Sequence, residues 1–168
     1  NLFGIIVAAC MIYNIEFKGN AVKKMYVLPI HVPAMYLCKF LILTILLSIA
    51  AALQNLVLTQ IGITSLPEGT FELYTLIIFA LYSLITAMPA LSFMLFIASR
   101  FENMWVPLGI GVAGFLSGMA LGTSKISLFL TDPFVMILKP AVSMSAEPDV
   151  SVIVIAIIET LLFLLAGL

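Results

Sequence analysis

The side chains that could support catalysis in this sequence lack the arrangement that membrane enzymes need. An intramembrane serine protease places a serine nucleophile and a base on facing helices. Ser117 lies in an apolar run beside Gly118, but the sole histidine, His31, lies in a basic segment between two apolar runs. An intramembrane aspartyl protease needs two aspartates inside the membrane, whereas Asp132 and Asp149 share one connecting segment. The sequence therefore predicts no catalysis within this chain.

Metal, nucleotide and nucleic-acid binding are also not indicated by the residue types. Cys10 and Cys38 are the only cysteines, and neither has the spacing of a metal ligand. The phosphate-binding pattern GxxxxGK[S/T] does not occur, so any ATP that the protein uses must bind elsewhere. The net charge of −1 gives no basic surface for phosphates, which excludes a nucleic-acid partner.

The overall composition explains why reactive residues are rare. Hydrophobic residues make up 64% of the chain and charged residues 9%. A soluble globular domain is about 45–50% apolar and about 25% charged. Because so few polar side chains cannot cover a folded surface that faces water, lipid must cover it. The sequence predicts an all-α polytopic membrane protein with a single transmembrane domain.

Five apolar runs are separated by more polar segments. A helix needs about 20 apolar residues to cross a hydrocarbon core of about 30 Å, since it rises about 1.5 Å per residue. Four runs reach this length, and the shorter first run has the character of an incomplete span. In chain order, the runs are residues 2–15, 36–58, 73–99, 104–122 and 150–168. The sequence starts without a methionine inside an apolar run, so we expect at least one segment upstream.

The distribution of lysine and arginine predicts the orientation of these runs. Cytoplasmic connections of membrane proteins carry more lysine and arginine than outer ones do. Placing the segment after the first run in the cytoplasm puts five Lys and Arg residues, Lys39 included, on the inner side and two on the outer side. Residues 59–72 and 123–149 are then outside, whereas residues 100–103 and the C-terminus are cytoplasmic. We predict a multi-pass protein of the plasma membrane.

Residues 16–29 have the pattern of an amphipathic helix that ends at a proline. One face would carry Phe17, Ala21, Met25 and Leu28, and the other Glu16, Asn20, Lys23, Lys24 and Val27. Such a helix could be an interfacial anchor that anionic lipid headgroups attract. It could equally be a docking element for a cytoplasmic protein, and the side-chain types alone do not decide between the two interpretations.

The same segment resembles part of a known family. Glu16, Gly19, Leu28-Pro29 and Lys39 follow the pattern E-x-x-G-x(8)-L-P-x(9)-K between the end of one run and the start of the next. This resembles the first intracellular loop of type-2 ABC exporter permeases, which contains the coupling helix that contacts the ATPase subunit. The order of short outer loop, tight inner turn and long outer segment is similar over nearly the whole chain. The small size most resembles permeases for antimicrobial peptides, including lantibiotic immunity exporters.

This resemblance implies a six-span fold, of which five spans are visible and one precedes residue 1. It implies a pair of ABC ATPase subunits that bind ATP and Mg²⁺, a second permease, identical or paralogous, and no cofactor in this chain. The substrate would be amphipathic or lipid-like, for instance an antimicrobial peptide. The residues assigned to ATPase coupling, from the resemblance and from side-chain type, are Glu16, Phe17, Lys18, Gly19, Lys23, Lys24, Met25, Leu28 and Pro29. Closure of the ATPase pair would move this segment and tilt the spans between two access states.

The long outer segment, residues 123–149, contains two short apolar stretches. They are residues 126–130 and 134–138, and Lys139-Pro140 interrupts the second. Both are too short to span, which is typical of re-entrant or interfacial helices whose backbone is covered by protein. The resemblance implies that they cap the exit path, and the alternative is a membrane-surface loop without a special role.

Gly114, Gly118 and Gly122 repeat every four residues and form a ridge of small side chains on one helix face. A second helix can approach such a ridge closely. We expect packing within this chain rather than a dimer contact.

Glu159 lies near the middle of the last apolar run. A charged carboxylate there costs about 2.5–3.5 kcal/mol on insertion scales, so the side chain must be protonated, paired or in contact with water. It could line the substrate path, or it could donate a hydrogen bond as a neutral acid to a nearby serine or threonine. The sequence leaves both interpretations open.

A channel or secondary-transporter subunit without an ATPase is the alternative function. No TVGYG-like filter and no ring-forming run of charges inside a span occurs, which disfavours a channel. No internal repeat is visible, which disfavours a secondary transporter. The sequence therefore favours the permease subunit of an ATP-driven exporter, with ATP hydrolysis on a separate subunit.

Overall fold

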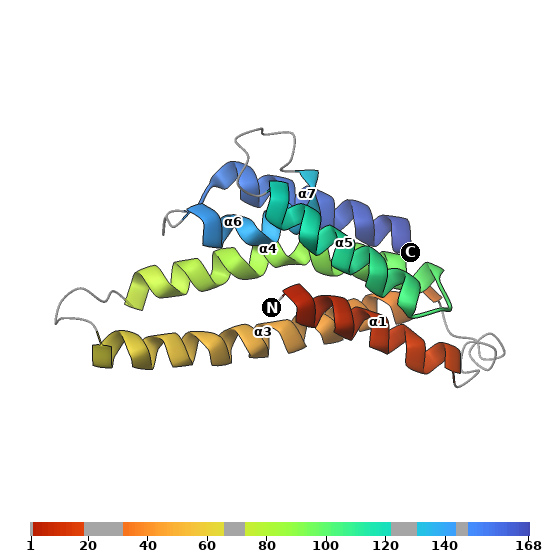
Figure 1. The fold of residues 1–168 in the computed structure, drawn as a ribbon, viewed down its shortest axis with the longest axis horizontal. Coiled ribbons are helices and arrows are strands. Elements are labelled where there is room, and N and C mark those ends of the chain that lie inside the picture. The colour runs from red at the N-terminus through yellow and green to blue at the C-terminus, as the bar shows by residue number, and fades with distance from the viewer. Residues whose placement is uncertain (1, 19–31, 66–72, 122–130, 144–147) are drawn as a thin grey trace.

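The computed structural model describes residues 2–18, 32–65, 73–121, 131–143 and 148–168. These residues form α1 (Leu2–Lys18), α3 (Val32–Ser65), α4 (Leu73–Arg100), α5 (Trp105–Leu121), α6 (Pro133–Ser143) and α7 (Val150–Gly167) (Figure 1). No strand occurs among the described residues. The prediction of an all-α polytopic membrane protein is confirmed.

The described helices differ in whether they are long enough to cross a membrane. Pro33–Thr64 in α3, Tyr74–Arg100 in α4 and Val150–Gly167 in α7 have the length and apolar character of spans. Helices α1 and α5 have 17 residues each. At about 1.5 Å per residue they are about 25 Å long, which is the short end of the range for a span.

Helix α3 extends beyond the apolar run 36–58 at both ends, and polar residues form its last turns. The hydroxyl of Thr59 donates to the carbonyl of Asn55, and that of Thr64 donates to the carbonyl of Gln60, both at 2.8 Å. Because these hydroxyls bond within their own helix, the polar residues after the apolar run do not end it. Its 34 residues give a length of about 51 Å.

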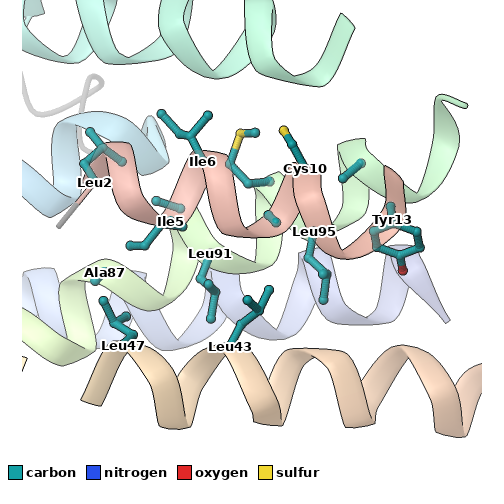
Figure 2. Packing of buried hydrophobic residues seen from close by; sticks show 14 of the residues in the cluster. Leu2, Ile5, Ile6, Cys10, Tyr13, Leu43, Leu47, Ala87, Leu91 and Leu95 are labelled. Atoms are coloured by element: carbon teal, nitrogen blue, oxygen red, sulfur yellow. The ribbon is translucent and has the colours of Figure 1, made fainter. Parts of the chain in front are cut away.

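Helix α4 lies at the centre of the bundle and contacts α1, α3, α6 and α7. Figure 2 shows Leu91 of α4 between Ile5 of α1 and Leu43 of α3. On the other side of α1, Ile6 points toward α5, where Gly111 leaves room for its side chain. Helix α4 continues through Pro89, whose ring is fully buried. Pro89, which removes one backbone hydrogen bond of α4, is thus enclosed by the packed interior of the bundle.

The five longer helices, α1, α3, α4, α5 and α7, alternate in direction, as a multi-pass bundle requires (Figure 1). Helices α1, α4 and α7 finish at one end of the bundle, where α3 and α5 begin (Figure 1). Lys18, Lys39 and Arg100 lie at this end, which we call the basic end. The end of α3, the start of α4 and helix α6 lie toward the other end (Figure 1).

The short helix α6 packs against α4, α5 and α7. Its Phe134 ring meets Phe93 of α4 edge to face, with ring centroids 5.7 Å apart. The expected interruption at Lys139-Pro140 is wrong, because α6 continues to Ser143. Proline has no backbone N–H, so Pro140 leaves α6 with only one hydrogen bond fewer. Its side chain is buried in the bundle. Residues 126–130, the other predicted stretch, lie outside the described residues.

Candidate functional site

Three of the predicted coupling residues belong to the last turn of α1. Glu16 and Phe17 are half-buried and Lys18 is exposed. The Phe17 ring stacks on Tyr13 at a centroid distance of 6.2 Å and packs against the core. The other six, which lie outside the described residues, are Gly19, Lys23, Lys24, Met25, Leu28 and Pro29.

Glu16 forms an ion pair with Lys39, near the start of α3. Lys39 Nζ lies 2.5 Å from Glu16 Oε2, and their side chains are only 13% and 19% exposed for Lys39 and Glu16 respectively. The same ammonium lies 3.8 Å from the centroid of the Tyr13 ring, a cation–π contact. Charged side chains with so little access to water need an opposite charge or another favourable partner close by. We call Tyr13, Glu16 and Lys39 the Lys39 cluster.

Sequence reasoning placed Glu16 and Lys39 in one motif but did not predict that they form a pair. The available signal was a carboxylate at the end of one apolar run and an ammonium just inside the next, each close to the hydrocarbon boundary. Opposite charges in such places are expected to meet when the two helices are neighbours. The sequence alone does not show that α1 and α3 are neighbours, so it could not predict the pair.

A second set of contacts at the basic end joins α3, α4 and α7. Arg100 Nη2 donates to the carbonyl of Ala166 at 3.3 Å. The Tyr36 ring lies against Gly167, where a side chain of any size would overlap it. Tyr36 is only 4% exposed, and its buried hydroxyl has no hydrogen-bond partner among the described residues. Because no described residue bonds it, the Tyr36 hydroxyl is desolvated without compensation.

Tyr36→Phe is therefore expected to stabilise the protein by about 1 kcal/mol, since it removes an unpaired buried hydroxyl and keeps the ring. Thermal unfolding of the purified protein in detergent measures the change. Tyr74→Phe is the matched control, because Tyr74 is exposed and its change should leave stability within about 0.5 kcal/mol. A lower stability of Tyr36→Phe would mean that the hydroxyl makes a favourable contact.

Glu159 is 6% exposed and lies on the face of α7 that also buries Val152 and Ala156. Phe163, one turn later, meets Phe93 of α4 at a centroid distance of 5.1 Å. Since α4 and α7 run in the same direction, Glu159 lies at about the level of Pro89, one turn before Phe93. The carboxyl group is thus inside the bundle and well away from both of its ends.

Within the described parts of the chain, the Oε2 atom of Glu159 has no hydrogen-bond partner. Two buried hydroxyls of the neighbouring helix α4 donate to backbone carbonyls instead, Thr86 to Tyr82 and Ser92 to Pro89. Thr160, the next residue on α7, likewise donates to the carbonyl of Ala156. A buried carboxyl group with one unpaired oxygen could accept a positively charged or hydrogen-bonding group.

The remaining candidates for chemistry make structural contacts. Asp132 and Asp149 accept the backbone N–H groups of Phe134 and Ser151, each at 2.9 Å, and so cap the N-termini of α6 and α7. The hydroxyl of Ser117 donates to the carbonyl of Gly114 at 2.8 Å. Both cysteines are free thiols. In the described part of the chain, no group of three acidic, histidine or cysteine side chains could hold a metal.

The glycine ridge of α5 lies against α6. A Cβ on Gly118 would lie 2.8 Å from the backbone oxygen of Phe134, and one on Gly114 would overlap the Phe134 ring. The absence of side chains therefore lets α6 lie directly on α5. Gly122 lies outside the described residues.

Comparison with known proteins identifies the family of this bundle. Comparisons with curated proteins and with solved structures give no match. Residues 1–118 match the family described as ABC-2 family transporter protein. The match includes α1, the predicted coupling segment, α3, α4 and most of α5. Because it covers well over half of the sequence, and because the structure is a bundle of apolar helices, the chain belongs to the ABC-2 family of transporters.

Proposed function

We propose that this chain is the permease of an ATP-driven exporter and that residues 16–29 form its contact with the ATPase. An ABC-2 permease is a transport subunit that associates with an ABC ATPase and is not itself catalytic. The observation that carries the proposal is the Lys39 cluster. It holds the end of α1 to the start of α3 at the basic end. The predicted coupling segment, residues 16–29, starts in the last turn of α1 and ends shortly before α3 begins at Val32.

The charges support a cytoplasmic position for this end of the bundle. Lys18, Lys39 and Arg100 gather there, as the positive-inside rule expects of a cytoplasmic surface. Exposed Lys18, with Lys23 and Lys24 in the segment that follows, would meet acidic residues on the ATPase. ATP and Mg²⁺ would bind to a pair of ATPase subunits, and their closure would move the segment and the helices on either side of it.

The surface of α3 supports a membrane setting with a second permease. Its long side chains face outward over most of the helix, among them Leu41, Ile45, Ile49, Leu53 and Leu56. Such a continuous apolar face needs lipid or another apolar helix to cover it. In the assembly that we propose, a second permease, identical or paralogous, covers part of this apolar surface and lipid covers the rest.

The interior supports an amphipathic or lipid-like substrate, with an antimicrobial peptide as our first candidate. Apolar side chains fill most of the described core, whereas Glu159 offers one buried carboxyl with an unpaired oxygen. An apolar path with one acidic position suits a molecule that combines apolar surface with a cationic or hydrogen-bonding group.

The export proposal is tested in cells that express the full permease together with its ATPase. A fluorescently labelled cationic amphipathic peptide is added, and the peptide retained by the cells is measured. We expect less retained peptide when both proteins are present, and no reduction when the ATPase carries a substituted phosphate-loop lysine. Equal retention with and without the permease would contradict the proposed substrate class.

Glu159→Gln is expected to reduce this efflux about tenfold, a loss of about 1.4 kcal/mol of interaction with the substrate. Glutamine keeps the size of the side chain but cannot carry its negative charge, so the bundle should stay folded. Glu102→Gln is the matched control, because Glu102 is exposed in the turn between α4 and α5. Efflux that is unchanged in Glu159→Gln would remove this residue from the substrate path.

A further inference from the structure

The ion pair between Glu16 and Lys39 joins two residues that are 23 positions apart in the sequence. Glu16 is in the last turn of α1, and Lys39 is the eighth residue of α3. Both side chains are largely enclosed. The centroid of the Tyr13 ring lies 3.8 Å from the ammonium, so in the described part of the chain Lys39 has two partners, both on α1.

The pair joins two helices that otherwise meet mainly through a third. Both α1 and α3 pack chiefly on α4, and their direct contact with each other is small. Near the middle of the bundle, Leu91 of α4 lies between Ile5 of α1 and Leu43 of α3 (Figure 2). At the basic end, by contrast, α1 and α3 touch directly through the Lys39 cluster. The cluster is therefore the contact that keeps these two helix ends at a fixed separation.

The position of the cluster matters because residues 19–31 connect the end of α1 to the start of α3 along the chain. A displacement of this segment acts on both ends at once, and a fixed separation passes the displacement to α3 as well as to α1. If the ends could separate, part of the displacement would be lost in spreading them apart.

We infer that Tyr13, Glu16 and Lys39 are positioning residues that make α1 and α3 move together when the ATPase displaces the segment between them. In this role Glu16 pairs within the chain and does not contact the ATPase, which changes the assignment that its motif suggested. The inference rests on the proposed function, because it needs an ATPase that acts on residues 16–29.

The test follows movement of α3 in the purified complex of the full permease and its ATPase. Cys38, an exposed thiol at the start of α3, accepts an environment-sensitive fluorophore, whereas Cys10 is buried. Adding ATP with vanadate traps the closed ATPase, and the change in fluorescence reports the movement. Pull-down of the ATPase with each variant measures docking separately.

We expect Glu16→Gln to keep the ATPase bound and to reduce the fluorescence change by about threefold or more, as for loss of a contact between directly coupled residues. Glu102→Gln is the matched control and should respond like the wild type. The exchanged pair, Glu16→Lys with Lys39→Glu, should restore part of the response. Restoration is incomplete because a carboxylate over the Tyr13 ring replaces the favourable ammonium.

A second pair of variants keeps the test decisive if Glu16→Gln does not fold. Tyr13→Leu removes the aromatic face and should reduce the response, whereas Tyr13→Phe keeps it and should not. An unchanged response in Glu16→Gln or, where that variant does not fold, in Tyr13→Leu, with the ATPase bound, would overturn the inference. Loss of the ATPase from Glu16→Gln but not from Lys39→Gln would also overturn it, since Glu16 would then be a docking residue. A wild-type permease that binds no ATPase would instead overturn the proposed function, and the inference with it.

Discussion

Leucine in place of Gly118 is expected to destabilise the protein by about 3 kcal/mol, the upper part of the range for overpacked positions. A Cβ at this position would already lie 2.8 Å from the backbone oxygen of Phe134 and 3.0 Å from its carbonyl carbon. A backbone cannot rotate away as a side chain can, so α6 must move away from α5. That movement would also disturb the contact between Phe134 and Phe93.

Gly109 provides the matched control on the same helix. It has no neighbouring atom within 4 Å of its Cβ position, so Gly109→Leu should leave stability unchanged or raise it slightly through helix propensity. Thermal unfolding in detergent compares the two variants. Equal effects at both positions would show that α6 does not lie against the glycine ridge.

The charge reversal Lys23→Glu with Lys24→Glu is expected to weaken binding of the ATPase by about 100-fold or more. Reversing both charges replaces attraction by repulsion, which costs several kcal/mol when like charges meet across an interface. The affinity of the purified permease for the ATPase, measured at low and at moderate salt, gives the effect. Because salt screens charges, wild-type affinity should fall as the salt concentration rises.

Lys139→Glu is the control for this reversal, because Lys139 lies on α6, away from the basic end. It should bind the ATPase as the wild type does. If the reversal at Lys23 and Lys24 has no larger effect than the control, the lipid-anchor interpretation of residues 16–29 is favoured over the docking interpretation.

Hydropathy predicted two of the helices well. The runs 73–99 and 150–168 nearly coincide with α4 and α7, because α4 ends at Arg100 and α7 begins directly after Asp149. The ends of α3 were missed, since hydropathy does not register that threonines can bond to their own helix. The second outer stretch was predicted too short for a different reason, because a buried proline can be kept inside a helix when neighbours surround it.

The candidate site was predictable only in part. The E-x-x-G motif indicated residues 16–29, but pairing between Glu16 and Lys39 depends on which helices are neighbours, and that depends on the packing of α1 and α3 on α4. Likewise, the sequence predicted that the glycine ridge would pack within the chain but could not identify Phe134 as the residue against it. The roles of Gly19, Lys23, Lys24, Met25, Leu28 and Pro29 stay predictions, since these residues lie outside the described ranges.

The most direct test of the proposed function is purification of the full wild-type permease from its own cells under mild detergent, followed by identification of the bound proteins. We predict that an ATPase with a GxxxxGK[S/T] phosphate loop is recovered in a one-to-one ratio with the permease subunits. Recovery of the permease as a stable assembly without any nucleotide-binding subunit would contradict the proposal that residues 16–29 couple transport to ATP.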